Sequence, residues 1–374
     1  MIKFVNNASV TKDVSGSTRG VNIYGFANKI SGLGQNARQV LRAINNTDIS
    51  YNYLDLFSAS KEFKFIEPTI NHKFKTNLFC CNPDIDLTDF INLKKNNHKK
   101  NIGLWAWEVE VLPEYWIKYS ELFDEIWTIS NFTKSIFEKE LPNKIIKSLN
   151  IPGAPFKLLD KSTCKQTFGI NSNTFLCSFV FDSFSDINRK NPLHVIESFE
   201  SSLGDEDSVL LIKCQNLSQE NRDILLNYPK TKKVKFIFET FSDELMNHLF
   251  CATDLYISLH RSEGSGLTIM EALSVGTPCL VTNYGGCLDF CLPEFCELVD
   301  YNFIEITEDI WYKNNFFKDK EVFWANPIVN DASNKIKKIF DNYDDYLIKT
   351  NELKNFIENN YNLENMSIFL KNNL

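Results

Sequence analysis

Residues 260–276, HRSEGSGLTIMEALSVG, join charged side chains to small residues at the point where an apolar run ends. The run Leu255–Leu259 predicts a buried strand, and the apolar positions of Leu267–Val275 have helical spacing. The small residues at 264–266 therefore open a helix, whose N-terminal backbone N–H groups can bind an anion such as phosphate. We expect an anion site at the carboxyl end of this strand.

Two carboxylates, Glu263 and Glu271, lie on either side of this helix start. Glu271 is about one turn into the helix, and a carboxylate beside a diphosphate would repel it, so Glu271 suits a partner rich in hydroxyl groups, such as a ribose diol. Glu263 stands on the loop, where the hydroxyls of a bound sugar could donate to it. The alternative is structural, with Glu263 as a helix cap and Glu271 in a surface salt bridge.

Arg189 and Lys190 form a second candidate group, directly before Asn191 and Pro192. Proline suits the first turn of a helix, so a helix is expected to begin here. Two cations at this position could neutralise a diphosphate as it departs. The alternative is an exposed basic pair that binds nothing.

Short apolar runs alternate with amphipathic segments along the chain, which predicts parallel βαβ units. The predicted strands are the start of 20–44, Thr76–Cys81, Asn101–Trp107, Glu125–Ser130, Thr174–Phe181, Ser208–Lys213, Val234–Phe238, Leu255–Leu259 and Pro278–Thr282. The predicted helices are the end of 20–44, Pro113–Phe123, Asn131–Glu140, Pro192–Ser202, Gln219–Asn227, Asp243–Cys251, Gly266–Val275 and much of Ala332–Leu374.

The segment 148–162 carries Pro152, Gly153 and Pro155 and has no helical spacing, so it is the predicted linker. We expect two Rossmann-like α/β domains facing each other across a cleft, which is the default ligand site of such sheets. The expected divisions are a first domain at 1–150, a linker at 151–162, a second domain at 163–350 and a C-terminal helix at 351–374 that packs back on the first domain.

The net charge, the cysteine spacing and the lengths of the apolar runs exclude some classes of protein. With 374 residues, 40 Lys and Arg and 48 Asp and Glu, the chain has a net charge of −8, which disfavours nucleic-acid binding. The ten cysteines form no CxxC pair and no metal-ligand spacing with the five histidines, so we expect buried thiols and neither metal nor cofactor. No signal-peptide core or 18-residue apolar run is present, which favours a cytoplasmic protein whose membrane contact is peripheral.

The passage DLYISLHRSEGSGLTIMEALSVGTPCLVTNYGGCLDF (254–290) resembles the nucleotide-sugar site of retaining glycosyltransferases of family 4. The matching positions are Glu263, Gly264, Gly266, Leu267, Glu271, Ala272, Gly276 and Pro278. Four further blocks resemble that family in order along the chain: GVNIYGFANKISGLGQNAR, NIGLWAWEVEVLPEYW with FDEIWTISNFTKSIF, DINRKNPLHVIESF, and WANP at 324–327.

This resemblance implies the GT-B fold, with 1–150 as the acceptor-side domain and 163–350 as the nucleotide-sugar domain, and it implies roles for single residues. Glu263 would lie by the donor sugar, Glu271 would bind the ribose, and Lys190 and Arg189 would neutralise the leaving diphosphate. The remaining implied donor contacts are Gly32, Gly34, His260, Arg261, Gly264, Ser265, Gly266 and Leu267, with Phe241 and Leu245 near the base.

Some positions depart from the family pattern. Phe184 stands where related enzymes often carry an arginine, so phosphate neutralisation rests on fewer cations or involves Arg261. The histidine that many members place near Trp107 or Glu108 is absent. Trp107 is either ordinary core or an aromatic wall for a sugar, and Glu108 is a candidate acceptor-side carboxylate.

The expected function is metal-independent transfer of a sugar, with retention of configuration, from a nucleotide-diphosphate sugar such as GDP-mannose to a glycan or lipid-linked acceptor. The resemblance is to mannosyl- and rhamnosyl-type enzymes of bacterial surface-polysaccharide (O-antigen) synthesis at the inner membrane. Three alternatives remain: a nucleotide-sugar 2-epimerase, a non-catalytic glycan-binding subunit, and a metal-dependent transferase that uses the DxD spacing of Asp84–Asp86.

Overall fold

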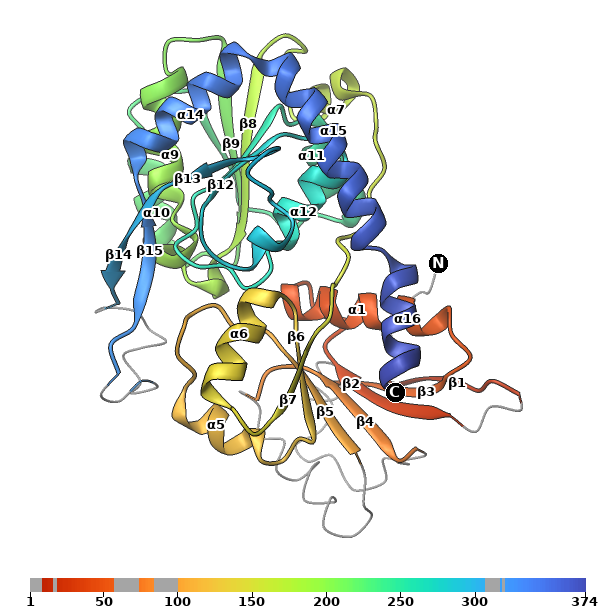
Figure 1. Cartoon of the computed structure of the whole chain (residues 1–374). Helices are drawn as coiled ribbons and strands as arrows, with labels where there is room; N and C mark the ends of the chain where they lie inside the picture. Colours follow the sequence, from red (N-terminus) through yellow and green to blue (C-terminus); the bar gives the residue numbers. More distant parts are fainter. Residues whose placement is uncertain (1–8, 16–18, 57–73, 84–99, 307–316, 318–319) are drawn as a thin grey trace. The chain divides into compact units, whose positions relative to one another are not determined.

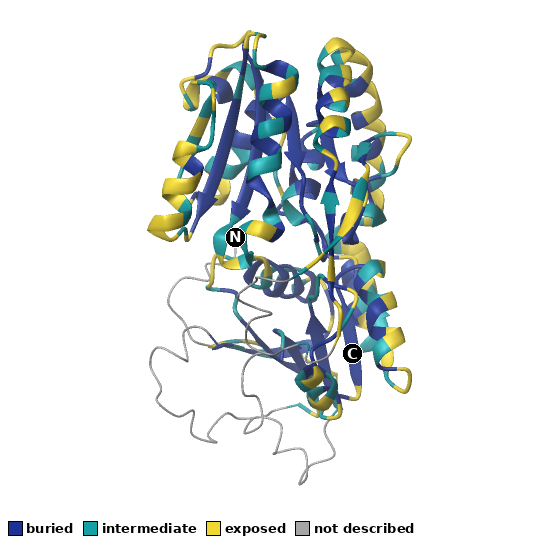
Figure 2. Ribbon diagram, turned by 90° about the vertical axis from the view of Figure 1, so that its left-hand side faces the viewer, coloured by how far each residue is buried: buried dark blue, intermediate teal, exposed yellow. Residues whose placement is uncertain are grey.

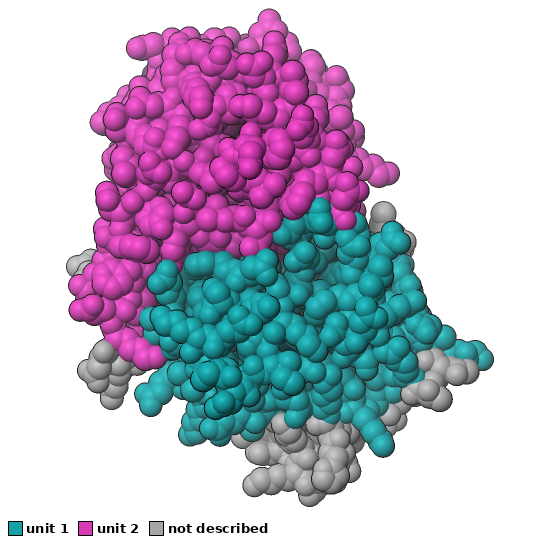
Figure 3. All heavy atoms as spheres, in the orientation of Figure 1, with its two compact units in different colours: residues 1–152, 360–374 teal, residues 153–359 magenta. Residues whose placement is uncertain are grey.

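The computed structural model describes residues 9–15, 19–56, 74–83, 100–306, 317 and 320–374. The chain divides into two compact units (Figure 3). Unit 1 comprises Met1–Pro152 and Asn360–Leu374, and unit 2 comprises Gly153–Asn359. Each unit contains a mostly or wholly parallel sheet flanked by helices (Figure 1).

Unit 1 is built on one mixed sheet. The strand order is β1 (Ser9–Lys12), β3 (Ser50–Asp55), β2 (Gly20–Gly25), β4 (Thr76–Cys80), β5 (Lys100–Trp105), β6 (Glu125–Thr128) and β7 (Ile145–Ser148). All neighbouring pairs are parallel except β1 with β3. The helices of the described part are α1 (Gly32–Asn45), α5 (Glu114–Ser120), α6 (Asn131–Glu140) and α16 (Leu363–Asn373).

Helix α16 completes the core of unit 1, although it comes from the end of the chain. Its Met366 and Leu370 are fully buried in the same cluster as α1 and the central strands. The Ser367 hydroxyl donates to the Ala43 carbonyl at 2.8 Å, and the Phe369 ring meets Trp127 edge-on at 5.0 Å. The last segment of the chain is therefore an integral element of unit 1.

Unit 2 has a parallel sheet and a separate hairpin. The sheet order is β10 (Val234–Ile237), β9 (Ser208–Gln215), β8 (Phe175–Asp182), β11 (Leu255–Ser258), β12 (Cys279–Thr282) and β13 (Glu297–Val299). The hairpin is antiparallel and consists of β14 (Tyr301–Glu305) and β15 (Phe323–Pro327). The α-helices are α7 (Lys161–Thr167), α8 (Ile187–Lys190), α9 (Pro192–Leu203), α10 (Gln219–Asn227), α11 (Asp243–Ala252), α12 (Leu267–Ser274), α14 (Val329–Asp341) and α15 (Tyr343–Asn360).

Burial explains why these sequences fold in this way. The apolar runs of β8 and β11 are buried along almost their whole length, as expected for parallel strands covered on both faces. In Figure 2 the sheets are dark blue, whereas the outer helices turn exposed faces to solvent. All ten cysteines are free thiols, and all are buried. Within the described residues, no helix is long and apolar enough to cross a bilayer.

Each predicted strand and helix of the described residues is present, with ends that shift by a few residues. The strands that the sequence analysis did not predict are β1, β3, β7, β13, β14 and β15. Three of them, β1, β7 and β13, have only three or four residues, which is too short for a periodic signal. The predicted unit limits also differ. Helix α7 begins inside the expected linker at 151–162, where Asp160 accepts a hydrogen bond from the Thr163 amide at 2.8 Å. Unit 2 extends to Asn359 instead of ending at 350, because α15 continues unbroken to Asn360.

Candidate functional site

The loops that follow β8 and β11 meet at the carboxyl edge of the unit 2 sheet. In the strand order, β8 is paired with β9 on one side and with β11 on the other, so the chain direction of the crossovers reverses between β8 and β11. The crevice at such a switch point is where open α/β sheets bind ligands. The loop after β8 supplies Arg189 and Lys190, and the loop after β11 supplies Glu263.

Lys190 and Glu263 are in direct contact at this switch point. The Lys190 Nζ atom lies 2.5 Å from Glu263 Oε2, although the residues are 73 positions apart. The two side chains are 17% and 18% exposed, so the pair is shielded but still open to solvent on one side. The other carboxylate oxygen, Oε1, accepts from the Gly266 backbone N–H at 3.3 Å. The pair therefore links the β8 loop to the start of α12.

Arg189 has a different position from Lys190. Its Nη1 atom donates to the Ser262 carbonyl at 2.7 Å, and its Nε atom donates to the Ser185 carbonyl at 2.9 Å. The closest approach to Glu263 Oε2 is 4.0 Å, and the residue is 8% exposed. Arg189 thus contributes charge to the site while its hydrogen bonds hold the two loops together.

The β8 loop is shaped by two residues with positive φ. Asp186, at φ 68°, caps α8 by accepting from the Asn188 amide at 2.6 Å and from the Arg189 amide at 3.2 Å. Asn191, at φ 56°, ends α8 and donates from Nδ2 to the Leu259 carbonyl at 2.9 Å. Asn and Asp tolerate this left-handed conformation better than most residues do, which explains how DINRKNP makes such a tight turn.

The loop before α12 depends on close backbone packing. The Gly286 N–H donates to the Glu263 carbonyl at 2.8 Å. Gly285 has φ 101°, and a Cβ atom there would lie 2.5 Å from the same carbonyl oxygen. Gly266, at φ 82°, is the N-cap of α12. Glycine is therefore required where the two loops approach each other.

The charges around Glu263 keep its carboxylate ionised. Burial alone would raise the pKa of Glu263, but the positive charges of Lys190, Arg189 and His260 hold that pKa well below its ordinary value. Burial alone would likewise lower the pKa of His260, yet Cys287, Glu263 and the Tyr284 carbonyl raise it above its ordinary value. The site is a compact cluster of opposite charges.

His260 is fully buried beneath this cluster. Its Nδ1 lies 3.0 Å from the Ser258 hydroxyl, and its Nε2 lies 2.9 Å from the Tyr284 carbonyl. The Cys287 Sγ atom is 3.7 Å from Nε2. Because every side of the ring is occupied by protein, His260 supports the loop and does not present a ring nitrogen to a ligand.

Arg261 is bound by its neighbours on both sides. Its Nε atom donates to Asn326 Oδ1 at 2.9 Å, and its Nη1 atom donates to the Asn188 carbonyl at 3.0 Å. The Arg261 carbonyl also accepts from the Ala325 N–H at 3.0 Å. These contacts attach the hairpin of β14 and β15 to the β11 loop.

Glu271 is on α12, and it is 8% exposed. Its Oε1 atom accepts a hydrogen bond from the Ala154 backbone N–H at 3.2 Å. A Cβ atom on Gly153 would lie 3.1 Å from the Glu271 Cγ atom. The residue therefore holds the first residues of unit 2 against α12, a structural contact that the sequence reasoning missed.

Phe241 and Leu245 lie near the carboxyl end of β9 and β10, on the loop before α11 and within that helix. Phe241 is 7% exposed and stacks on Phe168 at 6.1 Å, while Leu245 is half-buried. The Lys213 Nζ atom lies over the Phe241 ring at 5.5 Å and donates to Gln215 Oε1 at 3.0 Å. Sequence reasoning missed Lys213, because a lysine inside the apolar strand SVLLIKCQ gives no signal of its own.

Gly32 and Gly34, two of the predicted site residues, lie in unit 1 at the start of α1. Gly32 and Gly34 begin α1 as expected, but the Gly34 N–H donates to the Ser31 hydroxyl at 3.2 Å and is therefore used as a helix cap. A Cβ atom on Gly34 would lie 2.0 Å from the Lys29 carbonyl, whereas one on Gly32 would meet nothing within 4 Å. Arg38 donates to the carbonyls of Ala27 and Lys29 and so holds the preceding loop.

Trp105, the last residue of β5, and Trp107, just after the strand, contribute to the packed interior of unit 1. Trp105 is fully buried. Trp107 is half-buried, donates from Nε1 to the Val111 carbonyl at 2.9 Å and packs against Trp116 with ring centroids 4.5 Å apart. Glu108 is half-buried beside it. Trp107 therefore has a core contact on one face.

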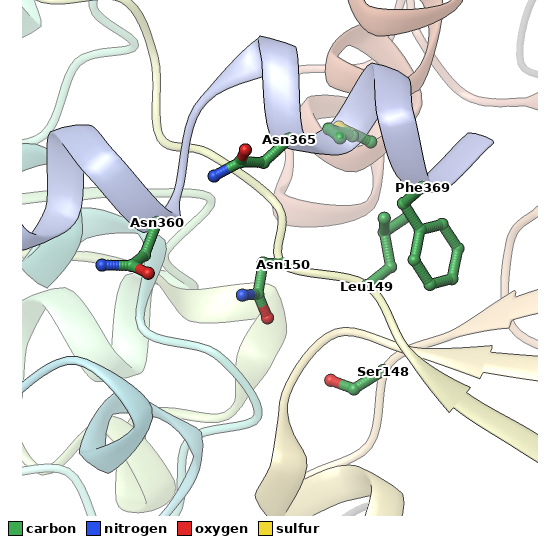
Figure 4. A pocket seen from close by; sticks show the side chains of 7 residues that line it. Ser148, Leu149, Asn150, Asn360, Asn365 and Phe369 are labelled. Atoms are coloured by element: carbon green, nitrogen blue, oxygen red, sulfur yellow. The ribbon is translucent and has the colours of Figure 1, made fainter. Parts of the chain in front are cut away.

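A cavity of about 290 Å³ also lies in unit 1 (Figure 4). It is lined by Ser148, Leu149, Asn150, Asn360, Asn365, Met366 and Phe369, where the end of β7 meets α16. None of the predicted site residues lines it. The motif Asp84–Asp86 lies outside the described residues. Within the parts of the chain that the structure describes, no three His, Cys, Asp or Glu side chains are grouped as metal ligands.

Comparisons with known proteins match both the segment that carries these residues and the fold of the chain. Residues 183–299 match the family model described as "Glycosyl transferases group 1". This segment contains every predicted site residue of unit 2, from Arg189 to Glu271. No curated protein sequence matches the chain.

Solved structures of similar fold cover nearly the whole chain. A glycosyltransferase from Rickettsia africae has 14% identity and a TM-score of 0.68, and the alignment covers 95% of this chain and 97% of that chain. Sucrose-phosphate synthase from Thermosynechococcus elongatus has 10% identity and a TM-score of 0.70 over 95% and 98%. HepE from Anabaena, solved in complex with UDP-glucose, has 10% identity and a TM-score of 0.68 over 94% and 98%. The protein therefore has the GT-B fold, with two Rossmann-like units, and its second unit carries the match to group 1 glycosyltransferases.

Proposed function

We propose that this protein transfers a sugar from a nucleotide-diphosphate sugar to a hydroxyl group of a glycan or lipid-linked acceptor. The observation that carries the proposal is the contact between Lys190 and Glu263 at the switch point of the unit 2 sheet. Both residues lie within the segment that matches the glycosyltransferase family model. The N-terminus of α12 lies beside them, with Gly266 as its N-cap.

This arrangement suits a donor that carries both phosphates and hydroxyls. The Lys190 ammonium group would bind a phosphate oxygen, and the N-terminal amides of α12 would add favourable dipoles. The Glu263 carboxylate, which its surroundings keep ionised, would accept hydrogen bonds from sugar hydroxyls. Glu271 would accept from the ribose, with its contact to Ala154 fixing its direction.

In the proposed step the bond between the anomeric carbon and the phosphate oxygen breaks as the acceptor oxygen bonds to the same carbon. The acceptor proton passes to an oxygen of the departing diphosphate. Lys190, with Arg189 behind it, would stabilise the negative charge that grows on the diphosphate. If attack occurs on the face that the diphosphate leaves, the configuration is retained. Because Lys190 and Arg189 would balance the charge of the diphosphate, the proposed step uses no metal ion.

The base of the donor nucleotide would bind beside β9 and the loop before α11. Lys213, Gln215 and Phe241 lie together at the carboxyl end of the sheet and would contact the base. The solved relatives include HepE with UDP-glucose and a pneumococcal O-GlcNAc transferase with UDP and GlcNAc, which favours a uridine donor over GDP-mannose as the first to test.

Thermal unfolding against a panel of nucleoside diphosphates and their sugars, with a chelator present throughout, tests the proposal. A ligand at 100 times its Kd adds about 2.7 kcal/mol to the free energy of unfolding, which raises the unfolding midpoint by several degrees. We expect one base to stabilise the protein and the chelator to make no difference. Stabilisation by none of the nucleotides would contradict a donor site and favour a purely glycan-binding role.

Two further measurements separate the finer alternatives. Proton NMR of the first product formed shows its anomeric configuration, and an inverted product would exclude the retaining step. Incubation of the donor without any acceptor tests the 2-epimerase alternative, because an epimerase would convert the donor sugar while the nucleotide stays attached.

A further inference from the structure

A row of four aromatic rings runs from the β12 loop onto the hairpin of β14 and β15. Tyr284 meets Tyr301 at 5.5 Å and Phe303 at 5.8 Å between ring centroids. Tyr301 and Phe303 are 5.2 Å apart, and Phe303 meets Phe323 at 6.3 Å. We call these residues, Tyr284, Tyr301, Phe303 and Phe323, the aromatic row.

The outer end of the aromatic row is open to solvent. Phe303 is 52% exposed and Phe323 is 39% exposed, whereas Tyr284 at the inner end is 6% exposed. Large apolar side chains that gather on a surface usually mark a binding site, whereas single exposed ones are ordinary. Ring-to-ring contacts keep the exposed rings in fixed orientations, which single exposed side chains lack.

The hairpin holds these rings on a rigid frame. Its register pairs Tyr301 with Pro327, Phe303 with Ala325 and Glu305 with Phe323, so the rings share one face. Trp324 points to the opposite face and is 5% exposed, which anchors the hairpin. A preordered surface loses little conformational entropy when it binds a ligand.

The inner end of the aromatic row is continuous with the candidate donor site. The Tyr284 carbonyl lies 2.9 Å from His260 Nε2. The next residues in the chain, Gly285 and Gly286, contact the Glu263 carbonyl, with the Gly286 N–H donating to it at 2.8 Å. At the base of the hairpin, Arg261 is bound to Asn326. The aromatic row therefore begins at the loop that carries Glu263 and leads away from it.

We propose that the aromatic row binds sugar rings of the acceptor glycan, outside the donor site. The apolar face of a pyranose ring, made of C–H groups, stacks on an aromatic ring and loses contact with water. The exposed Glu305 carboxylate, paired in register with Phe323, can accept hydrogen bonds from the hydroxyls around the same ring. This inference rests on the proposed function for the identity of the glycan as acceptor, but the binding itself can be measured without turnover.

Saturation-transfer NMR titrations of the full chain with maltotriose, cellotriose, mannotriose and chitotriose test the inference. We expect at least one trisaccharide to bind, and Phe303→Ala and Phe323→Ala each to weaken it by roughly five-fold or more. Phe303→Trp keeps an aromatic face and should retain binding. The matched control is Ile348→Ala, which removes an exposed apolar side chain on α15. Thermal unfolding of each variant checks that the fold is intact.

Several outcomes would overturn the inference. It is wrong if no trisaccharide binds, or if both alanine variants bind as the unmodified chain does. It is also wrong if the same variants lose sedimentation with vesicles of phosphatidylethanolamine and phosphatidylglycerol while trisaccharide binding is unchanged, because the row would then be a lipid-contacting surface.

Failure of the proposed function and failure of the aromatic-row inference give different results. A chain that binds a trisaccharide through Phe303 and Phe323 but is stabilised by no nucleotide would contradict sugar transfer and leave the aromatic row as a glycan site. If UDP stabilises the chain but trisaccharide binding is unchanged in the Phe303 and Phe323 variants, the donor site is supported and the aromatic row is not a glycan site.

Discussion

The guanidinium of Arg261 and the side-chain amide of Asn326, 65 residues apart, are joined by a hydrogen bond of 2.9 Å. This bond fixes the hairpin of β14 and β15 to the loop that carries Glu263. It also explains why the WANP segment matters structurally, because Asn326 and the Ala325 N–H both contact Arg261. The WANP segment at 324–327 thus holds the β11 loop, which lies about 60 residues earlier in the chain.

Replacing this amide should loosen the loop. We expect Asn326→Ala to lower the free energy of unfolding by about 1.5 to 3 kcal/mol, because a charged donor loses its partner. Urea unfolding measures the change. The exposed Asn330, the second residue of the neighbouring helix α14, gives a control in Asn330→Ala, which should be nearly neutral. Equal stability of the two variants would mean that the Arg261 contact contributes nothing.

Lys190 should matter more for turnover than for donor binding. We expect Lys190→Ala to lower kcat by about 10² to 10³ while the Kd for the nucleotide changes less, because the charge on the diphosphate grows as the bond breaks. Single-turnover kinetics and nucleotide titration measure the two effects. Lys232→Ala, which removes an exposed cation from the same unit, is the control. Unchanged kcat in the Lys190 variant would remove this residue from the chemistry.

Glu263 should make stability sensitive to acid. Because its folded-state pKa is depressed, ionised Glu263 stabilises the fold fully above the ordinary carboxyl pKa of 4.5, and this contribution is lost as the pH falls below that value. Glu263→Gln removes the titrating group. We therefore expect the unfolding midpoint of the unmodified chain to fall more steeply below pH 4.5 than that of the variant. Parallel acid limbs would show that the pKa of Glu263 is not depressed.

Two substitutions at Glu271 separate its structural contact from its proposed ligand contact. Glu271→Gln keeps an oxygen that can accept from the Ala154 N–H, so stability should stay close to that of the unmodified chain while stabilisation by the nucleotide falls. Glu271→Ala loses both. If the glutamine variant is stabilised by the nucleotide as strongly as the unmodified chain, the carboxylate charge has no part in donor binding.

Gly285 is expected to tolerate no side chain. Gly285→Ala would combine an unfavourable φ with a Cβ atom 2.5 Å from the Glu263 carbonyl, so we expect a loss of stability and of donor binding together. Gly169→Ala is a matched control, because φ there is 65° but a Cβ atom would meet nothing within 4 Å. The Gly285 variant should lose more stability than the Gly169 variant, because it adds the close contact with the Glu263 carbonyl and its φ of 101° is less favourable for a residue with a side chain than 65°.

Long, periodic segments of the sequence predicted the fold of the described residues well. The strand at Leu255 and the helix that follows it are present because apolar spacing reports burial directly. Lys190 and Glu263 could be placed at one edge of one sheet, since carboxyl ends of parallel strands share an edge. Short strands such as β7 carry too few residues for a periodic signal.

Contacts between distant residues could not be predicted in the same way. Nothing in the local pattern says that Glu271 meets Ala154, that Arg189 turns to the Ser262 carbonyl, or that His260 is enclosed on all sides. The same holds for the aromatic row, where Tyr284 and Phe323 come from separate segments. These arrangements depend on tertiary packing, which overrides local preference.

Helix α16 has a consequence for biosynthesis. The ribosome makes the strands of unit 1 before unit 2, but it makes Met366 and Leu370, whose buried side chains fill the core of unit 1, after unit 2. All of unit 2, from Gly153 to Asn359, leaves the ribosome before them and can fold in the meantime. The core positions of unit 1 that Met366 and Leu370 fill therefore stay uncovered until translation has passed the whole of unit 2.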